Sequence, residues 1–203
     1  RYNAGDAHLL LNAVDTRNFF AQPRGKQRVP TVGMLRENID IKGEDVLIAA
    51  LEIARREVPD LQLIAFGPER PTRRHPMPDG TIFIHRPTVD EIRGIYAQCD
   101  AWLFASRAGT EGFGMPVLEA MACRTPVIGV PTGAAPELLA DGAGLLVPHD
   151  DPKATADAIV RIARMADADW RTMSETAWRR AQEHRLKDAS DEFEKLLRFD
   201  VGF

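Results

Sequence analysis

The apolar residues of this chain recur with two different spacings. Six short apolar runs, each bounded by Gly, Pro or Asp, are typical of strands buried on both faces of a sheet. Helically spaced apolar residues lie between some of these runs, and this alternation builds a parallel sheet covered on both faces. We therefore expect an α/β fold with a small doubly wound sheet, whose strands are Thr31–Leu35, Leu61–Phe66, Thr81–His85, Ala101–Ala105, Pro126–Val130 and Gly144–Val147.

The clearest helical pattern lies between the first two strands. Its apolar residues form one stripe that we expect to face the core, made up of Val46, Leu47, Ala50, Leu51, Ala54 and Val58. A second helix is predicted to begin at Pro152 with Asp151 as its N-cap, because proline suits the first helical position and aspartate caps free amides. Its residues Ala158, Ile159 and Ile162 are expected to point inward.

The two ends of the chain differ from this central pattern. Residues 1–28 are interpreted as a linker or an edge strand, residues 29–181 as one domain, and residues 182–203 as a C-terminal helix. The helical stretches Trp170–His184 and Ala189–Arg198 are too charged to lie between the layers of the fold. We expect both to pack across its outside.

Composition narrows the class of partner. The 203 residues are 44% hydrophobic and carry a net charge of −4, which argues against a nucleic-acid surface because phosphate backbones bind to basic faces. Cys99 and Cys123 lack metal-ligand spacing and are expected to be buried thiols in a reducing, cytoplasmic compartment. A small ligand is the expected partner.

One local basic cluster lies in a segment that cannot be a regular helix. Prolines break helices, and Pro68–Pro78 contains four of them. The segment also carries Arg70, Arg73, Arg74 and His75. Because runs of charge are usually solvated, we interpret it as an exposed loop.

The candidate chemistry lies where the fourth strand runs into a glycine-rich loop and then a helix. Such a junction lies at the carboxyl edge of a parallel sheet, where open α/β folds bind ligands, and the amides of a helix start attract anions such as phosphate. Gly112 and Gly114 let the main chain approach a ligand, while Glu111 and Glu119 can accept hydrogen bonds from the vicinal hydroxyls of a sugar or ribose. A plain tight turn with a surface glutamate is the alternative.

The glycines after the first strand argue against a nicotinamide-dependent dehydrogenase. That class of site needs the pattern G-x-G-x-x-G directly after the strand. Here no glycine follows Gly33 until Gly43. A different nucleotide-binding mode is therefore expected.

Several segments together resemble the family-4 retaining glycosyltransferases of GT-B fold. EGFGMPVLE resembles the family's E-x7-E motif, in which Glu111 and Glu119 are the two acids, and the resemblance continues through EAMACRTPVIGVPTGAAPELLADGAGLLVPHDDP. The segment VGMLRENIDIKGEDVLIAAL resembles the family's first strand, phosphate loop and helix. The segment YAQCDAWLFAS resembles the stretch that leads into the motif. Leu11–Asp15 resembles the crossing between the two GT-B domains. The resemblance covers residues 9–165 and implies a Rossmann-like donor-binding domain, the C-terminal half of a GT-B enzyme.

The resemblance implies roles for the residues of the motif. Glu111 would contact the donor sugar and stabilise charge at the reacting carbon, which makes it the candidate catalytic residue. Glu119 would hold the ribose. The backbone after the first acid and the helix start would hold sugar and phosphate, at Gly112, Phe113, Gly114, Met115 and Leu118.

The remaining candidates, which include Gly33 as a contact to the donor, lie in or just after the first and third strands. Lys42 matches the family's phosphate lysine, a cation that suits a diphosphate leaving group. The family's arginine directly after Gly33 is replaced by Met34, so Arg36, on the same strand face, is a candidate phosphate contact, with capping of the strand end as the alternative. His85 is a candidate base contact, with a structural role as the alternative.

The parent enzyme implied by this family transfers a sugar, with retention, from a nucleoside diphosphate sugar to a hydroxyl of an acceptor glycan, lipid or small molecule. No cofactor and no metal site are expected. The acceptor would bind to an N-terminal domain, so this chain alone would bind donor without turnover. The resemblance places the parent in the cytoplasm, with peripheral association at the inner face of a membrane left open. A GT-B sugar phosphorylase or epimerase and a degenerate, non-catalytic nucleotide-sugar-binding module remain as alternatives.

Overall fold

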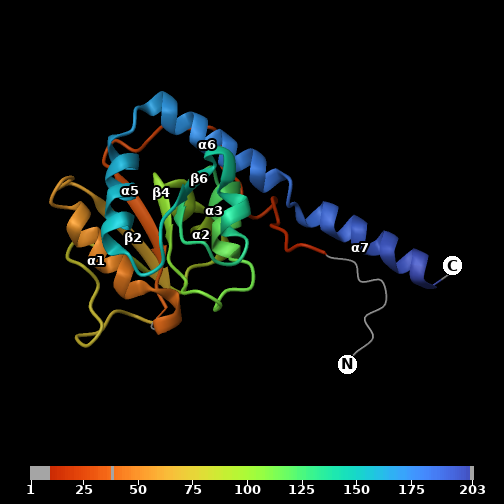
Figure 1. The fold of residues 1–203 in the computed structure, drawn as a ribbon, viewed down its shortest axis with the longest axis horizontal. Coiled ribbons are helices and arrows are strands. Elements are labelled where there is room, and N and C mark those ends of the chain that lie inside the picture. Colours follow the sequence, from red (N-terminus) through yellow and green to blue (C-terminus); the bar gives the residue numbers. More distant parts are fainter. Residues whose placement is uncertain (1–9, 38, 202–203) are drawn as a thin grey trace.

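A single sheet of parallel strands forms the centre of the molecule (Figure 1). The structure, a computed structural model, describes residues 10–37 and 39–201. Its strand order is β3-β2-β1-β4-β5-β6, and the strands are β1 (Thr31–Leu35), β2 (Gln62–Gly67), β3 (Ile82–His85), β4 (Ala101–Phe104), β5 (Val127–Gly129) and β6 (Gly144–Leu146). The predicted α/β fold with a Rossmann-like doubly wound sheet is confirmed, and the strand ends differ from the predicted ones by a single residue.

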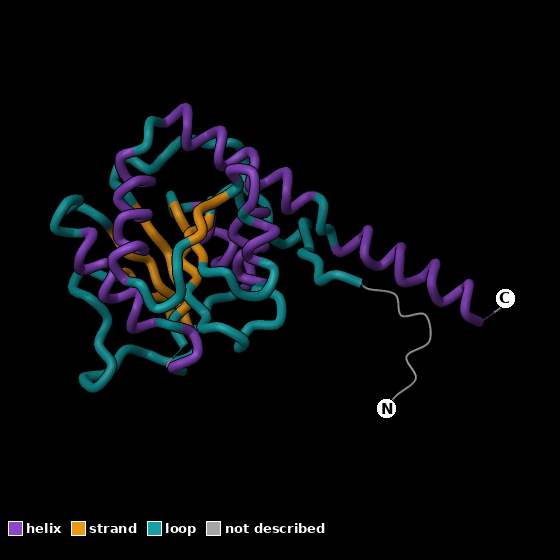
Figure 2. The backbone as a smooth tube through the Cα atoms, viewed as in Figure 1, coloured by secondary structure: helices purple, strands orange, loops and turns teal. Residues whose placement is uncertain are grey.

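Helices cover both faces of the sheet (Figure 2). The helices are α1 (Glu44–Ala54), α2 (Val89–Ala97), α3 (Met115–Ala122), α4 (Ala135–Leu138), α5 (Pro152–Arg164), α6 (Asp167–Gln182) and α7 (Leu186–Val201), with short 3-10 turns at η1 (Asp40–Lys42) and η2 (Ala140–Gly142). Helices α1 and α5 pack on one face, and α2 and α3 pack on the other. The predicted inward stripe of α1 is buried along its whole length.

Successive strand residues alternate between two hydrophobic cores. Leu63 and Leu103 point toward α1 and α5, whereas Ile64, Trp102 and Phe104 point toward α2 and α3. This alternation follows from the period of two of a strand. Both faces of the sheet are therefore apolar, as the nearly continuous apolar runs of the sequence predict.

The two C-terminal helices behave differently from each other. Helix α6 packs across the amino edge of the sheet, with Trp170 in one core and Ala177 in the other, as predicted. Helix α7 instead projects away from the domain (Figure 1), and Phe193 and Leu197 are exposed. The expectation that α7 packs across the outside is wrong. The helix contacts the domain near its first turn, where the Leu186 amide donates to the carbonyl of Val14 at 2.9 Å, and Phe193 and Leu197 further along stay exposed.

The described part of the N-terminal segment is extended and forms no strand. Its one sheet-like contact is an isolated bridge between Val14 and Arg185, at the turn between α6 and α7. Further along, the Arg24 guanidinium stacks 4.5 Å from the centre of the Trp170 ring. The expected edge strand is therefore absent from residues 10–28, and residues 1–9 lie outside the described part.

The thiols and the proline-rich segment are arranged as the sequence predicts. Cys99 and Cys123 are free and buried, and burial raises the pKa of the Cys123 thiol to about 12. Residues 68–78 form a loop between β2 and β3 without a helix. Across the described residues, none of the helices is long and apolar enough to cross a membrane.

Asp151 caps α5, since its side chain accepts a hydrogen bond from the amide of Ala154 at 2.9 Å. We expect Asp151→Ala to lower the free energy of unfolding by about 0.5–2 kcal/mol, measured by urea denaturation. The control is Asp157→Ala on the same helix, which removes only an exposed ion pair with Lys153 and should cost about 0.5 kcal/mol or less. Equal losses in the two variants would contradict the capping role.

Candidate active site

The site lies between β1 and β4, where the order in which successive strands join the sheet reverses. Strands β1 and β4 are neighbours in the centre of the sheet, although β2 and β3 separate them along the chain. The helix that follows β1 packs on one face and the helix that follows β4 packs on the other. The two loops therefore diverge at the carboxyl edge and leave a crevice, which is where open α/β sheets bind ligands.

Close backbone contact fixes the loop after β1 against the loop after β4. Gly43 has a φ of +66°, and a Cβ there would lie 2.3 Å from the carbonyl oxygen of Ala105, so only glycine allows this approach. The amide of Arg107 donates a hydrogen bond to the carbonyl of Ile41 at 2.8 Å. The Arg107 guanidinium also pairs with Asp45 at 2.9 Å. These contacts set the relative positions of the two loops.

A lysine and a glutamate meet across the crevice. The ammonium of Lys42 donates to Glu111 Oε2 at 3.1 Å. The hydroxyl of Ser106, at the end of β4, donates to the same oxygen at 3.3 Å. Both charged side chains remain partly open, with 28% of Lys42 and 16% of Glu111 exposed. The pair thus lies at the surface of the crevice, with Ser106 buried beneath it.

The start of α3 presents its backbone beside this pair. Gly114 has a φ of +95° and is the N-cap of α3, with proline at the helix start. A side chain at Gly112 would meet no protein atom within 4 Å, so the surrounding protein does not require glycine there. The Phe113 ring packs edge-on against His184, with centroids 6.2 Å apart. Met115, at the start of the helix, is half-buried.

The second acid lies one turn further along α3. Its carboxylate accepts a hydrogen bond from the Tyr96 hydroxyl at Oε2, at 2.9 Å. Burial raises the pKa of Glu119, and the hydrogen bond from Tyr96 partly opposes that rise. The two acids of the loop and helix therefore have different partners, Glu111 a lysine and a serine, Glu119 a tyrosine.

Two of the candidate residues lie inside the core. Gly33 is in the middle of β1 rather than at its end, and a Cβ there would lie 2.5 Å from the Trp102 ring and 2.6 Å from the Cys99 sulfur. Leu118 is 0% exposed. Both positions pack in the core, and a donor contact through the backbone of Gly33 or Leu118 stays a prediction.

Arg36 also lies away from the crevice. Its side chain is 1% exposed, and its guanidinium donates to the carbonyls of Glu69 and His75, at 3.2 Å each. Its Nε is 3.7 Å from Glu44. Arg36 thus fastens the proline-rich loop to the end of β1, which favours the capping alternative. Its contact with phosphate has no support in this structure.

Met34 and His85 are the last two positions singled out in the sequence. Met34 is 1% exposed in the core, so the position where the family carries its arginine is filled by an apolar side chain. His85 lies at the end of β3, with Nε2 3.0 Å from the carbonyl oxygen of Pro68. This contact fits the structural role, and a contact with the nucleotide base stays a prediction.

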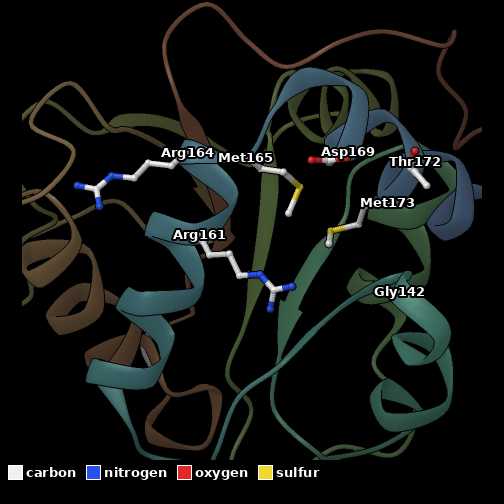
Figure 3. Close-up of a pocket in the computed structure, with 7 residues that line it drawn as sticks. All are labelled: Gly142, Arg161, Arg164, Met165, Asp169, Thr172 and Met173. Atoms are coloured by element: carbon white, nitrogen blue, oxygen red, sulfur yellow. The ribbon is translucent and has the colours of Figure 1, made fainter.

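A second hollow lies at the opposite, amino edge of the sheet, between α5 and α6 (Figure 3). It measures about 640 Å³ and is lined by Gly142, Arg161, Arg164, Met165, Asp169, Thr172 and Met173. Asp169 lines this hollow, and nearby Asp167 accepts hydrogen bonds from the Lys26 amide at 2.8 Å and from Arg171 at 2.6 Å. None of the candidate site residues lines this hollow. A cavity of about 20 Å³ adjoins the crevice itself, beneath Lys42 and Ser106.

Sequence reasoning missed three residues of the site. Ser106 follows β4 directly, and its position at a strand end was the available signal. Tyr96 belongs to a segment that resembles the family, but nothing in the linear pattern pairs it with Glu119. Arg107 gave no signal, because its partners Asp45 and Asp150 are distant in the sequence.

Comparison with known proteins identifies the family. A family model described as "Glycosyl transferases group 1" matches residues 26–165. The chain therefore belongs to the group 1 glycosyltransferases, and its fold is that of the Rossmann-like half of a GT-B enzyme.

One relative and two solved structures illustrate the similarity. A GDP-mannose-dependent alpha-(1-6)-phosphatidylinositol monomannoside mannosyltransferase of Mycolicibacterium smegmatis is 32% identical over 172 residues, which is 74% of this chain and 45% of the relative. Anabaena HepE in complex with UDP-glucose superposes with a TM-score of 0.75 at 20% identity, over 93% of this chain and 56% of HepE. The C-terminal domain of the group 1 protein LpcC from Francisella tularensis superposes with a TM-score of 0.70 at 24% identity, over 86% of this chain and 100% of that domain. The chain thus spans about half the length of the M. smegmatis relative and of HepE.

The packing role of Gly33 can be tested by substitution. We expect Gly33→Ala to lower the free energy of unfolding by about 1–3 kcal/mol, because the new methyl group overlaps Trp102 and Cys99. Gly94→Ala is the control, since a Cβ in that helical position meets nothing closer than 3.9 Å and alanine favours helices. Denaturation curves for the two variants should move in opposite directions. An unchanged stability of Gly33→Ala would show that the core has room for the methyl group.

Proposed function

We propose that this domain binds a nucleoside diphosphate sugar at the carboxyl edge of its sheet. The observation that carries the proposal is the meeting of Lys42 and Glu111, 3.1 Å apart, beside the start of α3. A cation and free helix amides suit a diphosphate. A partly open carboxylate next to them suits the hydroxyls of the attached sugar.

Each group has a distinct task in this proposal. Lys42 and the amides from Gly112 to Met115 hold the diphosphate, Glu111 contacts the transferred sugar, and Glu119 holds the ribose. Gly112 supports this assignment, because the open space beside it leaves the backbone accessible to a ligand. When a diphosphate arrives, Lys42 turns from Glu111 to the phosphates, and Glu111 becomes free to accept from sugar hydroxyls.

In the whole protein, we propose that the sugar passes to an acceptor hydroxyl with retention at the anomeric carbon. The bond from that carbon to the diphosphate oxygen breaks, and a bond to the acceptor oxygen forms. The acceptor hydroxyl loses its proton to the departing diphosphate oxygen. Glu111 stabilises positive charge at the carbon, while Lys42 and the amides stabilise the negative leaving group. The M. smegmatis relative depends on GDP-mannose by its name, and HepE holds UDP-glucose. Both support a nucleoside diphosphate sugar as donor.

One feature favours a second candidate, a binding module without activity. Met34 is apolar and buried where the family carries a phosphate arginine, and Arg36 is occupied by backbone carbonyls. Lys42 would then be the main cation available to the leaving group. A thermal-shift screen of this chain against UDP, GDP, ADP and their common sugar conjugates tests both candidates. Stabilisation by a sugar nucleotide supports either one, and sugar transfer by the whole protein separates them.

The lysine is the first residue to test. We expect Lys42→Ala to weaken diphosphate binding by about 1.5–3 kcal/mol, the range for a hydrogen bond to a charged group, measured by calorimetry. Lys153→Ala is the control, because Lys153 pairs with Asp157 on the exposed surface of α5. Equal affinity of wild type and Lys42→Ala would remove the phosphate assignment.

The two acids should differ in which ligand they discriminate. We expect Glu119→Ala to weaken bare diphosphate and sugar diphosphate alike, because both contain the ribose. Glu111→Ala should leave the affinity for bare diphosphate unchanged or slightly stronger, since it removes the nearer of the two carboxylates beside Lys42. It should cost the sugar conjugate about 1–3 kcal/mol. Titration of both variants with both ligands gives the four affinities. Equal losses for the two ligands in Glu111→Ala would mean that the sugar contact belongs to another residue.

A further inference from the structure

A buried tyrosine hydroxyl lies in an aromatic nest. Tyr96 is 0% exposed, and its ring meets Phe19, Phe66 and Trp102 with centroids 6.2, 6.2 and 4.5 Å away. A phenylalanine would fill the same space, so packing does not require the hydroxyl. A buried hydroxyl lowers stability unless it is hydrogen-bonded, and this one donates to Glu119 Oε2 at 2.9 Å.

The hydrogen bond joins two helices on one face of the sheet. Tyr96 is in the last turn of α2, and Glu119 is in the middle of α3. Three aromatic rings fix the direction of the Tyr96 side chain, and the hydroxyl reaches Oε2 from inside the protein. The Glu119 side chain is only half-buried, so its carboxylate is held on the inner side and open on the outer side.

We propose that Tyr96 is a positioning residue for ribose recognition, and that it sets the preference of this site for ribonucleoside over deoxyribonucleoside diphosphates. The inference rests on the proposed function, in which Glu119 accepts hydrogen bonds from the ribose hydroxyls. A carboxylate whose orientation is already fixed loses less freedom when it binds a ligand. The donated hydrogen bond also favours the ionised form, which accepts from both hydroxyls.

The measurement is the ratio of two affinities. The full chain is titrated by calorimetry with whichever of UDP, GDP and ADP stabilises it most, and with the 2′,3′-dideoxy form of the same nucleotide. In wild type we expect the ribonucleotide to bind about tenfold tighter or more, as for hydrogen bonds to a charged group. Tyr96→Phe should reduce this ratio about three- to tenfold and leave the dideoxy affinity unchanged.

A packing control separates positioning from damage to the nest. Phe66→Leu alters the nest around the Tyr96 ring and keeps the hydroxyl, so it should lower thermal stability without changing the ratio. In a Glu119→Ala background, Tyr96→Phe should have no further effect on the ratio, because its target is gone. A similar fall of the ratio in Phe66→Leu would overturn the positioning role.

The dependence on pH gives a readout that packing alone would not move. Burial raises the pKa of Glu119 and the Tyr96 hydrogen bond lowers it, so loss of the hydroxyl raises that pKa further. Protonated Glu119 accepts hydrogen bonds less well, so the ribose preference should be lost as the pH is lowered. In Tyr96→Phe this loss should begin at a higher pH than in wild type. Burial raises the pKa of the neighbouring Cys123 thiol to about 12, so this thiol stays neutral. Glu119 adds to the rise, and Arg93 and Arg24 oppose it.

The outcomes distinguish this inference from the proposed function. Tyr96→Phe with an unchanged ratio and an unchanged pH dependence overturns the role of Tyr96, provided that Glu119→Ala abolishes the ratio. If Glu119→Ala itself leaves the ribose preference intact, the ribose assignment of the proposed function fails instead. Glu119→Gln, which keeps an acceptor for Tyr96 but has no charge, should lose the pH dependence of the ratio.

Discussion

The parallel pairing of β1 with β4 is the constraint on which the site depends. Val32 pairs with Ala101 and Met34 with Leu103, so both strands end at the same edge of the sheet. Because their helices pack on opposite faces, the two loops open away from each other. Lys42 and Glu111 are 69 positions apart in the chain, and this pairing brings them within hydrogen-bond distance. Without it the chain would still contain a lysine and a glutamate, but no common site.

The second requirement is the close approach of the loops. Gly43 lies against the backbone of Ala105, and Arg107 ties its own loop to Ile41 and Asp45. A side chain at position 43 would clash with this backbone and force the two loops apart. The geometry of the charged pair is therefore set by backbone contacts and an arginine that are themselves outside the pair.

Both acids have partners within the protein, and the partners differ in kind. Glu111 is paired with a cation that a diphosphate can attract away, whereas Glu119 is bonded to a neutral hydroxyl that is buried in an aromatic nest. In the proposed function, the Lys42 contact of Glu111 exchanges when a diphosphate binds, whereas the Tyr96 contact of Glu119 is kept. Glu111 would then change its partner during the reaction, and Glu119 would keep its orientation.

Local pattern was sufficient for the elements of the fold. The strands, the buried stripe of α1, the Asp151 cap and the proline-rich loop all depend on neighbours a few residues away, so their residues alone predict them. The candidate site was predicted less completely. Local pattern did not indicate that Gly33 and Leu118 lie in the core, because the depth of a residue within a strand or helix depends on what packs over it.

The sequence by itself determined the family, the strands in their order along the chain, and the two acids with their glycine-rich loop, since each of these depends on contiguous residues. The tertiary structure decided which side chains meet. It brought Lys42 and Ser106 to Glu111 and Tyr96 to Glu119, and it directed Arg36 to the carbonyls of the proline-rich loop. It also left Phe193 and Leu197 of α7 exposed. These outcomes depend on the order of the strands within the sheet and on packing between distant segments, and no periodicity within a single segment contains that information.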